Sequence, residues 1–178
     1  MWKTVGHDKA VHALSQALTD NRMSHAFLIT GSSRVGKMSL AMDMARALNC
    51  VGDVPPCGVC GQCRRVTDDL HPDVRVIGLE MDSDTGRLRT VISIEQVRDV
   101  QRDVSLKPYE GRHRVVIFDG VEKLREEAAN SLLKTLEEPP DQVVIILLAS
   151  NAGDVLPTIL SRCRRIDLRP IGAEIIAD

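Results

Sequence analysis

The segment GSSRVGKM, residues 31–38, has the composition and spacing of a loop that binds phosphate. Gly31 and Gly36 permit a tight backbone path, the N–H groups of the loop can hold phosphate oxygens, and Lys37 can reach terminal phosphates. An apolar run precedes the loop and a helical pattern follows it, which is the context that such a loop requires. The pattern therefore predicts a nucleotide site that contains Gly31, Gly36 and Lys37.

The residue after this lysine departs from the pattern. Phosphate loops of nucleotide-hydrolysing proteins carry Ser or Thr there, whose hydroxyl binds Mg²⁺. This chain has Met38, and a thioether is a poor ligand for a hard cation. Ser39 lies one position too late, because one residue along a helix turns the side chain by about 100° around the axis. Met38 is therefore expected in the cofactor site without serving as a magnesium ligand.

A second motif is the apolar run VVIFDG at 115–120, which ends in an acid. At the end of a strand, Asp119 is placed to organise Mg²⁺, the alternative being an acid that only caps a turn. ATPases of this architecture carry Glu next, which acts on the attacking water. This chain has Gly120 instead, and we expect the nearby Glu122 to point elsewhere. Because Met38 also lacks the hydroxyl that binds Mg²⁺, we expect ATP and Mg²⁺ to bind weakly if at all, with little or no hydrolysis.

The cysteines form the third motif, because four of the five lie within fourteen residues. They are Cys50, Cys57, Cys60 and Cys63, in a loop rich in Gly and Pro. Tetrahedral zinc takes four thiolates at about 2.3 Å and can fix a small loop that has no core of its own. A redox pair and a set of free thiols are the alternatives, and the odd total with one tight cluster favours a reducing compartment. The spacing predicts a structural zinc module at about 49–66.

Alternating strand and helix patterns must position these motifs. Five apolar runs predict buried strands at 26–30, 74–79, 114–119, 143–149 and 164–168. Helical periodicity predicts helices at 1–19, 37–48, 93–106, 126–138 and 157–161, and a polar turn or hairpin is predicted at 81–89. This alternation is typical of an α/β fold with a five-stranded parallel sheet flanked by helices.

Composition argues against several classes of function. A net charge of −2 does not suit a domain that binds nucleic acid by its own charge, and one Trp, one Tyr and two Phe leave no platform for base stacking. Charged residues such as Lys3 and Asp8 interrupt the N-terminal segment, which excludes a signal peptide pattern. No apolar run approaches the roughly 18 residues of a membrane helix. We expect a cytoplasmic protein without membrane contact.

Five segments in a fixed order form a specific combination. They are HAFLITGSSRVGK (25–37), the four-cysteine loop, HPDV (71–74), NSLLKTLEEPP (130–140) and LPTILSRC (156–163). Together they resemble the subunits of the bacterial DNA polymerase III clamp loader, which are AAA+ proteins, over nearly the whole chain. The resemblance implies a P-loop AAA+ core at 1–170 with the zinc module inserted. It also implies that 171–178 is the start of a truncated lid domain.

The resemblance implies roles for single residues as well. In this family the zinc module belongs to the gamma/tau motor subunits and to delta-prime, and motors keep Ser or Thr after the lysine and an Asp-Glu pair. With Met38 and Gly120 at these two positions, the chain resembles delta-prime, a stator that does not hydrolyse ATP. The alternative is a gamma/tau motor. Arg162 is implied as an arginine finger for the neighbouring subunit's ATP, and Ser150 and Asn151 as sensors of the γ-phosphate.

The implied partners are the other clamp-loader subunits (gamma/tau and delta), the sliding clamp, and primed DNA through the complex. The implied task is the loading of the clamp onto primed DNA. In the family a lid and a collar domain follow the core, and the collar drives pentamer formation. Because the chain carries neither, we expect it to be a monomer in isolation. An unrelated phosphate-loop nucleotide kinase would leave the LEEPP and SRC segments unexplained.

Overall fold

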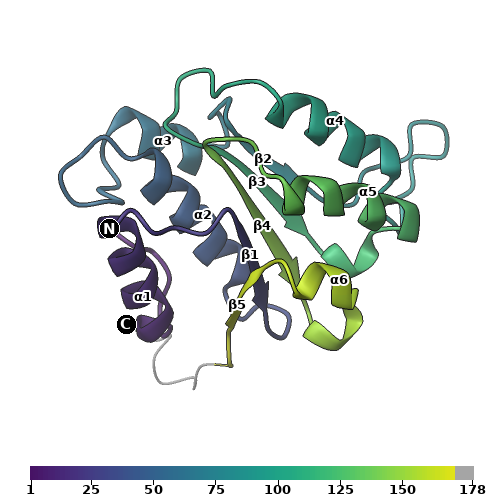
Figure 1. Cartoon of the computed structure of the whole chain (residues 1–178), viewed down its shortest axis with the longest axis horizontal. Coiled ribbons are helices and arrows are strands. Elements are labelled where there is room, and N and C mark those ends of the chain that lie inside the picture. The colour runs from purple at the N-terminus through teal and green to yellow at the C-terminus, as the bar shows by residue number, and fades with distance from the viewer. Residues whose placement is uncertain (171–178) are drawn as a thin grey trace.

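A computed structural model describes residues 1–170 as three layers built around one sheet (Figure 1). The five strands are β1 (Ala26–Thr30), β2 (Val74–Ile77), β3 (Arg114–Asp119), β4 (Val143–Ala149) and β5 (Arg164–Asp167). Their order is β2-β3-β4-β1-β5, and every neighbouring pair is parallel, which confirms the predicted sheet. The predicted start of a lid domain, 171–178, lies outside the described residues.

Helices cover both faces of the sheet (Figure 1). On one face lie α1 (Asp8–Thr19), α2 (Lys37–Asn49) and α3 (Gly61–Thr67). On the other lie α4 (Ile94–Val104), α5 (Glu126–Glu137) and α6 (Pro157–Leu160). Two short 3₁₀ helices, η1 (Val121–Lys123) and η2 (Ala152–Asp154), follow β3 and β4. Within residues 1–170, none of the helices has the length and apolar character needed to cross a bilayer.

The central strand β4 explains why the strand patterns are apolar along their whole length. Ile145 and Leu147 are buried in the core beneath α4 and α5. Ile146 and Leu148 are buried in the core beneath α1 and α2. Because a strand places successive side chains on opposite faces, a sheet covered on both faces needs an apolar residue at every position. The sheet edge at the carboxyl ends of these strands therefore carries the polar residues of the site.

The predicted N-terminal helix is partly wrong, because α1 begins only at Asp8 and not at the start of 1–19. The preceding residues run beside α2, where Asp43 is fully buried. Its carboxylate accepts the backbone N–H groups of Lys3 at 2.8 Å and Thr4 at 2.7 Å. These hydrogen bonds, which join residues far apart in the sequence, hold the segment in a non-helical path that periodicity alone does not reveal.

The other predicted helices and strands are confirmed to within two residues at each end. Ser93 caps α4, and its side chain and that of Gln96 form the capping box. The predicted hairpin at 81–89 is present, with an antiparallel bridge between Met81 and Leu88. These features depend on residues a few positions apart, which explains why local patterns predict them.

The HPDV segment (71–74) holds the loop at 109–111 through the side chain of Asp73. The side chain of Asp73 is 0% exposed and accepts N–H groups from Tyr109 at 2.7 Å, Glu110 at 2.9 Å and Gly111 at 2.8 Å. Arg114 adds an ion pair at 3.1 Å. Burial by itself raises the pKa of Asp73, but these N–H donors and Arg114 outweigh it and leave the pKa below its ordinary value.

We expect Asp73→Asn to lower the free energy of unfolding by about 3 kcal/mol at pH 7, because Arg114 loses its partner in a buried site. The pKa of Asp73 is lower in the folded state, so its stabilisation is full above the unfolded pKa of about 3.9. It is lost as the pH falls through the folded pKa. Urea unfolding of both proteins should therefore show a difference that shrinks in acid. Asp141→Asn, at an exposed position, is the control, and an equal loss in both variants would refute the assignment.

Candidate nucleotide site and cysteine cluster

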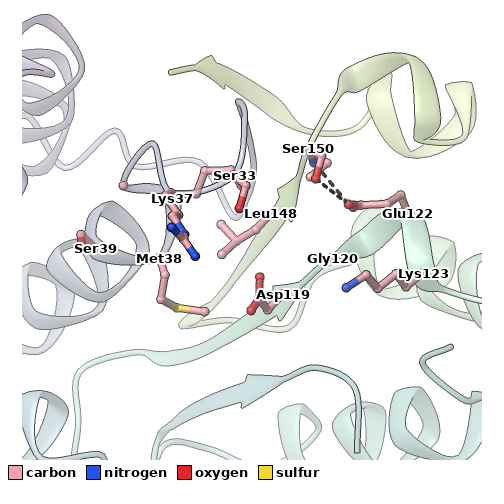
Figure 2. A pocket seen from close by; sticks show the side chains of 13 residues that line it. Ser33, Lys37, Met38, Ser39, Asp119, Gly120, Glu122, Lys123, Leu148 and Ser150 are labelled. Atoms are coloured by element: carbon pink, nitrogen blue, oxygen red, sulfur yellow. Dashed lines mark hydrogen bonds between the residues drawn. The ribbon is translucent and has the colours of Figure 1, made fainter. Parts of the chain in front are cut away.

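A cavity of about 430 Å³ lies at the carboxyl ends of β3 and β4, beside the N-terminus of α2 (Figure 2). Ligands of open parallel sheets bind at this edge. The cavity is lined by residues of the phosphate loop, of the β3–η1 turn and of the end of β4: Ser33, Arg34, Gly36, Lys37, Met38, Ser39, Asp119, Gly120, Glu122, Lys123, Leu148, Ala149 and Ser150. The structure thus brings together the phosphate loop and the strand-end acid, as the motifs predict.

The phosphate loop has the backbone that its glycines predict. Gly31 has a φ of 153°, and a Cβ there would lie 2.6 Å from the carbonyl oxygen of Leu168, so the close approach requires glycine. Gly36 has a φ of 99° and precedes the first residue of α2. The ammonium of Lys37 donates to the carbonyl oxygens of Gly31 at 2.6 Å and Ser32 at 2.8 Å. A helix N-terminus with a lysine on this loop fits the phosphates of a nucleotide.

The magnesium position does not fit Mg²⁺. Met38 extends from α2 toward Asp119, so the thioether stands where a hydroxyl would be needed (Figure 2). Asp119 lines the cavity at the end of β3, as predicted. Ser39 also lines the cavity, although it is one residue beyond the required position. The site therefore keeps the strand-end acid of a magnesium site and lacks the hydroxyl that completes it.

The expectation that Glu122 points away from the site is wrong. The 3₁₀ turn of η1 brings Glu122 to the cavity, where one carboxylate oxygen accepts the N–H of Ser150 at 3.3 Å and its hydroxyl at 3.1 Å (Figure 2). Asn151 is not among the residues that line the cavity. Its side-chain oxygen accepts the N–H of Gly153 at 3.1 Å and caps η2. Of the two predicted sensors, only Ser150 reaches the cavity.

The sequence analysis missed Lys123. Its ammonium points toward Asp119 from the side opposite Met38 (Figure 2). Gly120 has a φ of 90°, and a Cβ there would lie 3.1 Å from the Cδ atom of Lys123. The lysine stem therefore lies over the bare Cα of Gly120. A glycine in place of the expected acid, followed three residues later by a lysine, is the signal that could have revealed it.

Arg162 lies outside this cavity, at the end of α6. Its guanidinium donates to the carbonyl oxygen of Thr158 at 2.7 Å and pairs with the carboxylate of Glu137 at 2.5 Å. About a third of the side chain is exposed, at 32%. The contact joins the LEEPP segment to the SRC segment. Arg162 is thus partly fixed on the surface and does not reach the chain's own cavity.

The four clustered cysteines meet at one point. The sulfur atoms of Cys50, Cys57, Cys60 and Cys63 all lie within 4.8 Å of one another. Zinc–sulfur bonds of about 2.3 Å place tetrahedral ligands about 3.8 Å apart, so the cluster fits zinc. Backbone N–H groups of Cys57 and Cys60 donate to the preceding sulfurs at 3.3 Å. Burial opposes ionisation of Cys60, but N–H groups of Cys63 and Val51 outweigh it and lower the pKa to about 6.

A helix begins inside the cysteine loop, because α3 starts at Gly61 and contains Cys63. Cys50 ends α2 as its C-cap residue. Both cysteines are fully buried, whereas Cys57 and Cys60 are partly exposed. The cluster therefore joins the end of α2 to the start of α3 across a loop that has little core of its own.

Comparison with known proteins agrees with this geometry. The family model described as DNA polymerase III, delta subunit, matches residues 6–172. The tau/gamma subunit of Haemophilus influenzae DNA polymerase III is 37% identical over 169 residues, which are 94% of this chain and 23% of that protein. The delta-prime subunit of the same organism is 35% identical over 92% of this chain and 48% of that protein. The Bacillus subtilis delta-prime subunit is 28% identical over 99% of this chain and 52% of that protein.

Solved structures share the fold. A gamma subunit-related protein from Thermotoga maritima matches with a TM-score of 0.64 and 24% identity, over 90% of this chain and 47% of that one. The RuvB branch migration motor of the same organism matches with a TM-score of 0.54 and 15% identity, over 93% of this chain and 45% of that one. These likenesses confirm the AAA+ fold. The chain spans between 23% and 52% of the length of the curated relatives named above. By its family match and its relatives, the chain belongs to the DNA polymerase III clamp-loader subunits that include delta-prime and tau/gamma.

Proposed function

We propose that this chain is the AAA+ core of a stator subunit, of the delta-prime type, in the clamp loader of the replicative DNA polymerase. It completes the loader ring and supplies Arg162 to the ATP site of the neighbouring subunit. In this role its own site does not drive the reaction. Its contribution is a rigid frame and a fixed positive charge.

The composition of the cavity carries this proposal. The position after Lys37 offers a thioether, and the position after Asp119 has no side chain. Hydrolysis of ATP needs a magnesium ion held by a hydroxyl and an acid, and a group that orients the attacking water. Two of these parts are lost from one site, which favours a subunit that does not hydrolyse ATP.

The surface position of Arg162 supports the second half of the proposal. An arginine finger acts in trans, so its guanidinium must be accessible from outside its own subunit. Arg162 is partly exposed and lies outside its own cavity. Its contacts with Thr158 and Glu137 orient the guanidinium before any partner binds. A side chain held in this way loses less entropy when it engages a phosphate.

As a stator, the subunit would work inside a larger complex. Its partners are the gamma/tau and delta subunits, with the sliding clamp and primed DNA reached through the assembled loader. The four cysteines hold a structural zinc ion that shapes the module at 49–66. We place the protein in the cytoplasm, where the loader works and where thiols stay reduced.

A motor subunit of the gamma/tau type is the alternative. Identity to the Haemophilus influenzae tau/gamma subunit, 37%, is slightly higher than identity to its delta-prime subunit, 35%. Glu122 also lines the cavity, and an acid there could orient a water molecule once it is released from Ser150. The two functions differ in one measurable property, which is magnesium-dependent ATP turnover at this cavity.

We expect the purified chain to release no phosphate from ATP above background, with or without Mg²⁺. The reason is the missing hydroxyl and acid around Lys37 and Asp119. A phosphate-release assay checks this, with Lys37→Ala as the control that separates turnover at this cavity from a contaminating ATPase. Magnesium-dependent release that Lys37→Ala abolishes would reject the stator proposal and establish the motor alternative.

A further inference from the structure

The cavity contains a second lysine that phosphate-loop chemistry does not require. Lys123 comes from η1, after the strand that carries Asp119, whereas Lys37 comes from the loop on the opposite wall. Figure 2 shows the ammonium of Lys123 directed toward Asp119. On the other side of Asp119 lies the thioether of Met38, in the place of the hydroxyl that would bind a metal ion. Two ammonium groups thus face the same cavity from different elements.

Gly120 makes this arrangement possible. A Cβ at this position would lie 3.1 Å from Cδ and 3.4 Å from Cε of Lys123, so the lysine stem would have to shift by a few tenths of an ångström to admit a side chain there. The φ of 90° is also a conformation that other residues rarely adopt. The turn that carries no acid after Asp119 thus lets the stem of Lys123 pack closely over position 120. A glutamate at position 120 would need a strained backbone and a shift of the lysine stem from its present place.

The charges in the cavity favour an anion. Arg34, Lys37 and Lys123 line it with positive charge, against the carboxylates of Asp119 and Glu122. Ser150 already donates two hydrogen bonds to Glu122. The phosphate loop supplies backbone N–H groups for the same ligand. A polyphosphate placed on the loop would bring its negative charge between the two ammonium groups.

We propose that Lys123 takes the place of Mg²⁺, so that this cavity holds the polyphosphate of a nucleoside di- or triphosphate without a metal ion. Lysine binds phosphate as a compact point charge, which is what neutralisation requires. It cannot act as a Lewis acid or fix water ligands around a transferring phosphoryl group. The nucleotide is then a structural ligand that stabilises the phosphate loop and is not turned over. This inference rests on the proposed stator function, in which the site does not hydrolyse ATP.

Titration of ADP into the chain, followed by calorimetry, tests the inference. The magnesium-free buffer is prepared by passage over a chelating resin, because a soluble chelator would also compete for metal at the cysteine cluster. We expect the Kd to agree within about twofold with and without Mg²⁺, since Lys123 already places a positive charge where the metal ion would bind. ADP should also raise the thermal midpoint of unfolding equally under both conditions.

Matched lysine variants locate the effect. Lys123→Met keeps the length of the stem and removes the charge, and we expect ADP binding to weaken at least about tenfold. Lys123→Arg should retain most of the affinity. Lys134→Met, at an exposed position of α5 outside the cavity, should bind as the wild type does. Lys123 is itself exposed, so its replacement should leave the midpoint without nucleotide within about 2 °C of wild type.

Three results would overturn the inference: no ADP binding by the wild type, binding that requires Mg²⁺, or wild-type affinity in Lys123→Met. These outcomes are separable from failure of the proposed function. If ADP does not bind but Arg162 still acts on the neighbouring subunit, the stator proposal stands and only the role of Lys123 is lost. If the chain turns over ATP with Mg²⁺, the stator proposal and this inference both fail.

Discussion

Replacement of Arg162 by Ala should lower ATP turnover at the neighbouring site of the reconstituted clamp loader by about 10³-fold or more, the effect of losing an arginine finger. The reason is electrostatic. The transferring phosphoryl group accumulates negative charge in a site from which water is excluded, and a fixed guanidinium stabilises that charge. The assembled complex should retain only the turnover of sites that Arg162 does not serve. The measurement is ATP turnover stimulated by clamp and primed DNA.

The contacts of Arg162 make this experiment clean. They are a backbone carbonyl of the same helical turn, the exposed hydroxyl of Ser161 and the half-exposed carboxylate of Glu137. Exposed ion pairs contribute about 1 kcal/mol or less, so Arg162→Ala should fold and assemble normally. Arg164→Ala, two residues along the chain and at an exposed position, is the control for a general loss of positive charge. Arg162→Lys should not restore turnover, because lysine cannot reproduce the planar fork. Unchanged turnover in Arg162→Ala would contradict the proposal.

Loss of the metal should have the second large effect. We expect about one zinc ion per purified chain and none in Cys60→Ser, because a hydroxyl is a much weaker ligand than a thiolate. Structural zinc contributes roughly 10–16 kcal/mol of binding free energy in small zinc modules. In this chain the loss should unfold the module at 49–66, lower the thermal midpoint and expose the segment to protease. Elemental analysis and limited proteolysis measure these changes.

The fifth cysteine supplies the control. Cys163 lies outside the cluster, and burial raises the pKa of its thiol to about 11, so it stays protonated at neutral pH. Cys163→Ser should therefore keep the zinc ion. Cys60 is the position of choice in the cluster because it is partly exposed, so its replacement removes a ligand without opening the core. A metal-free wild type with a disulfide in the cluster would favour the redox alternative instead.

The sequence by itself determined the three motifs and most of the helices and strands. The strands are confirmed because parallel strands covered on both faces must be apolar throughout, and that pattern is local. The turn at Gly36, the cap at Ser93 and the meeting of the four sulfurs also follow from residues a few positions apart. The resemblance to the clamp-loader family rested on the same local segments and is confirmed by the relatives.

Only the tertiary structure decided which distant residues meet. Asp43 holds the N-terminal segment outside α1, although the sequence analysis predicted a helix over the whole of 1–19. A turn permitted by Gly120 brings Lys123 into the cavity beside the phosphate loop. The order of the strands and the packing of α5 against α6 set Glu137 beside Arg162. Periodicity reports which face of an element is buried, whereas these contacts depend on how whole elements pack, and no short stretch of sequence contains that information.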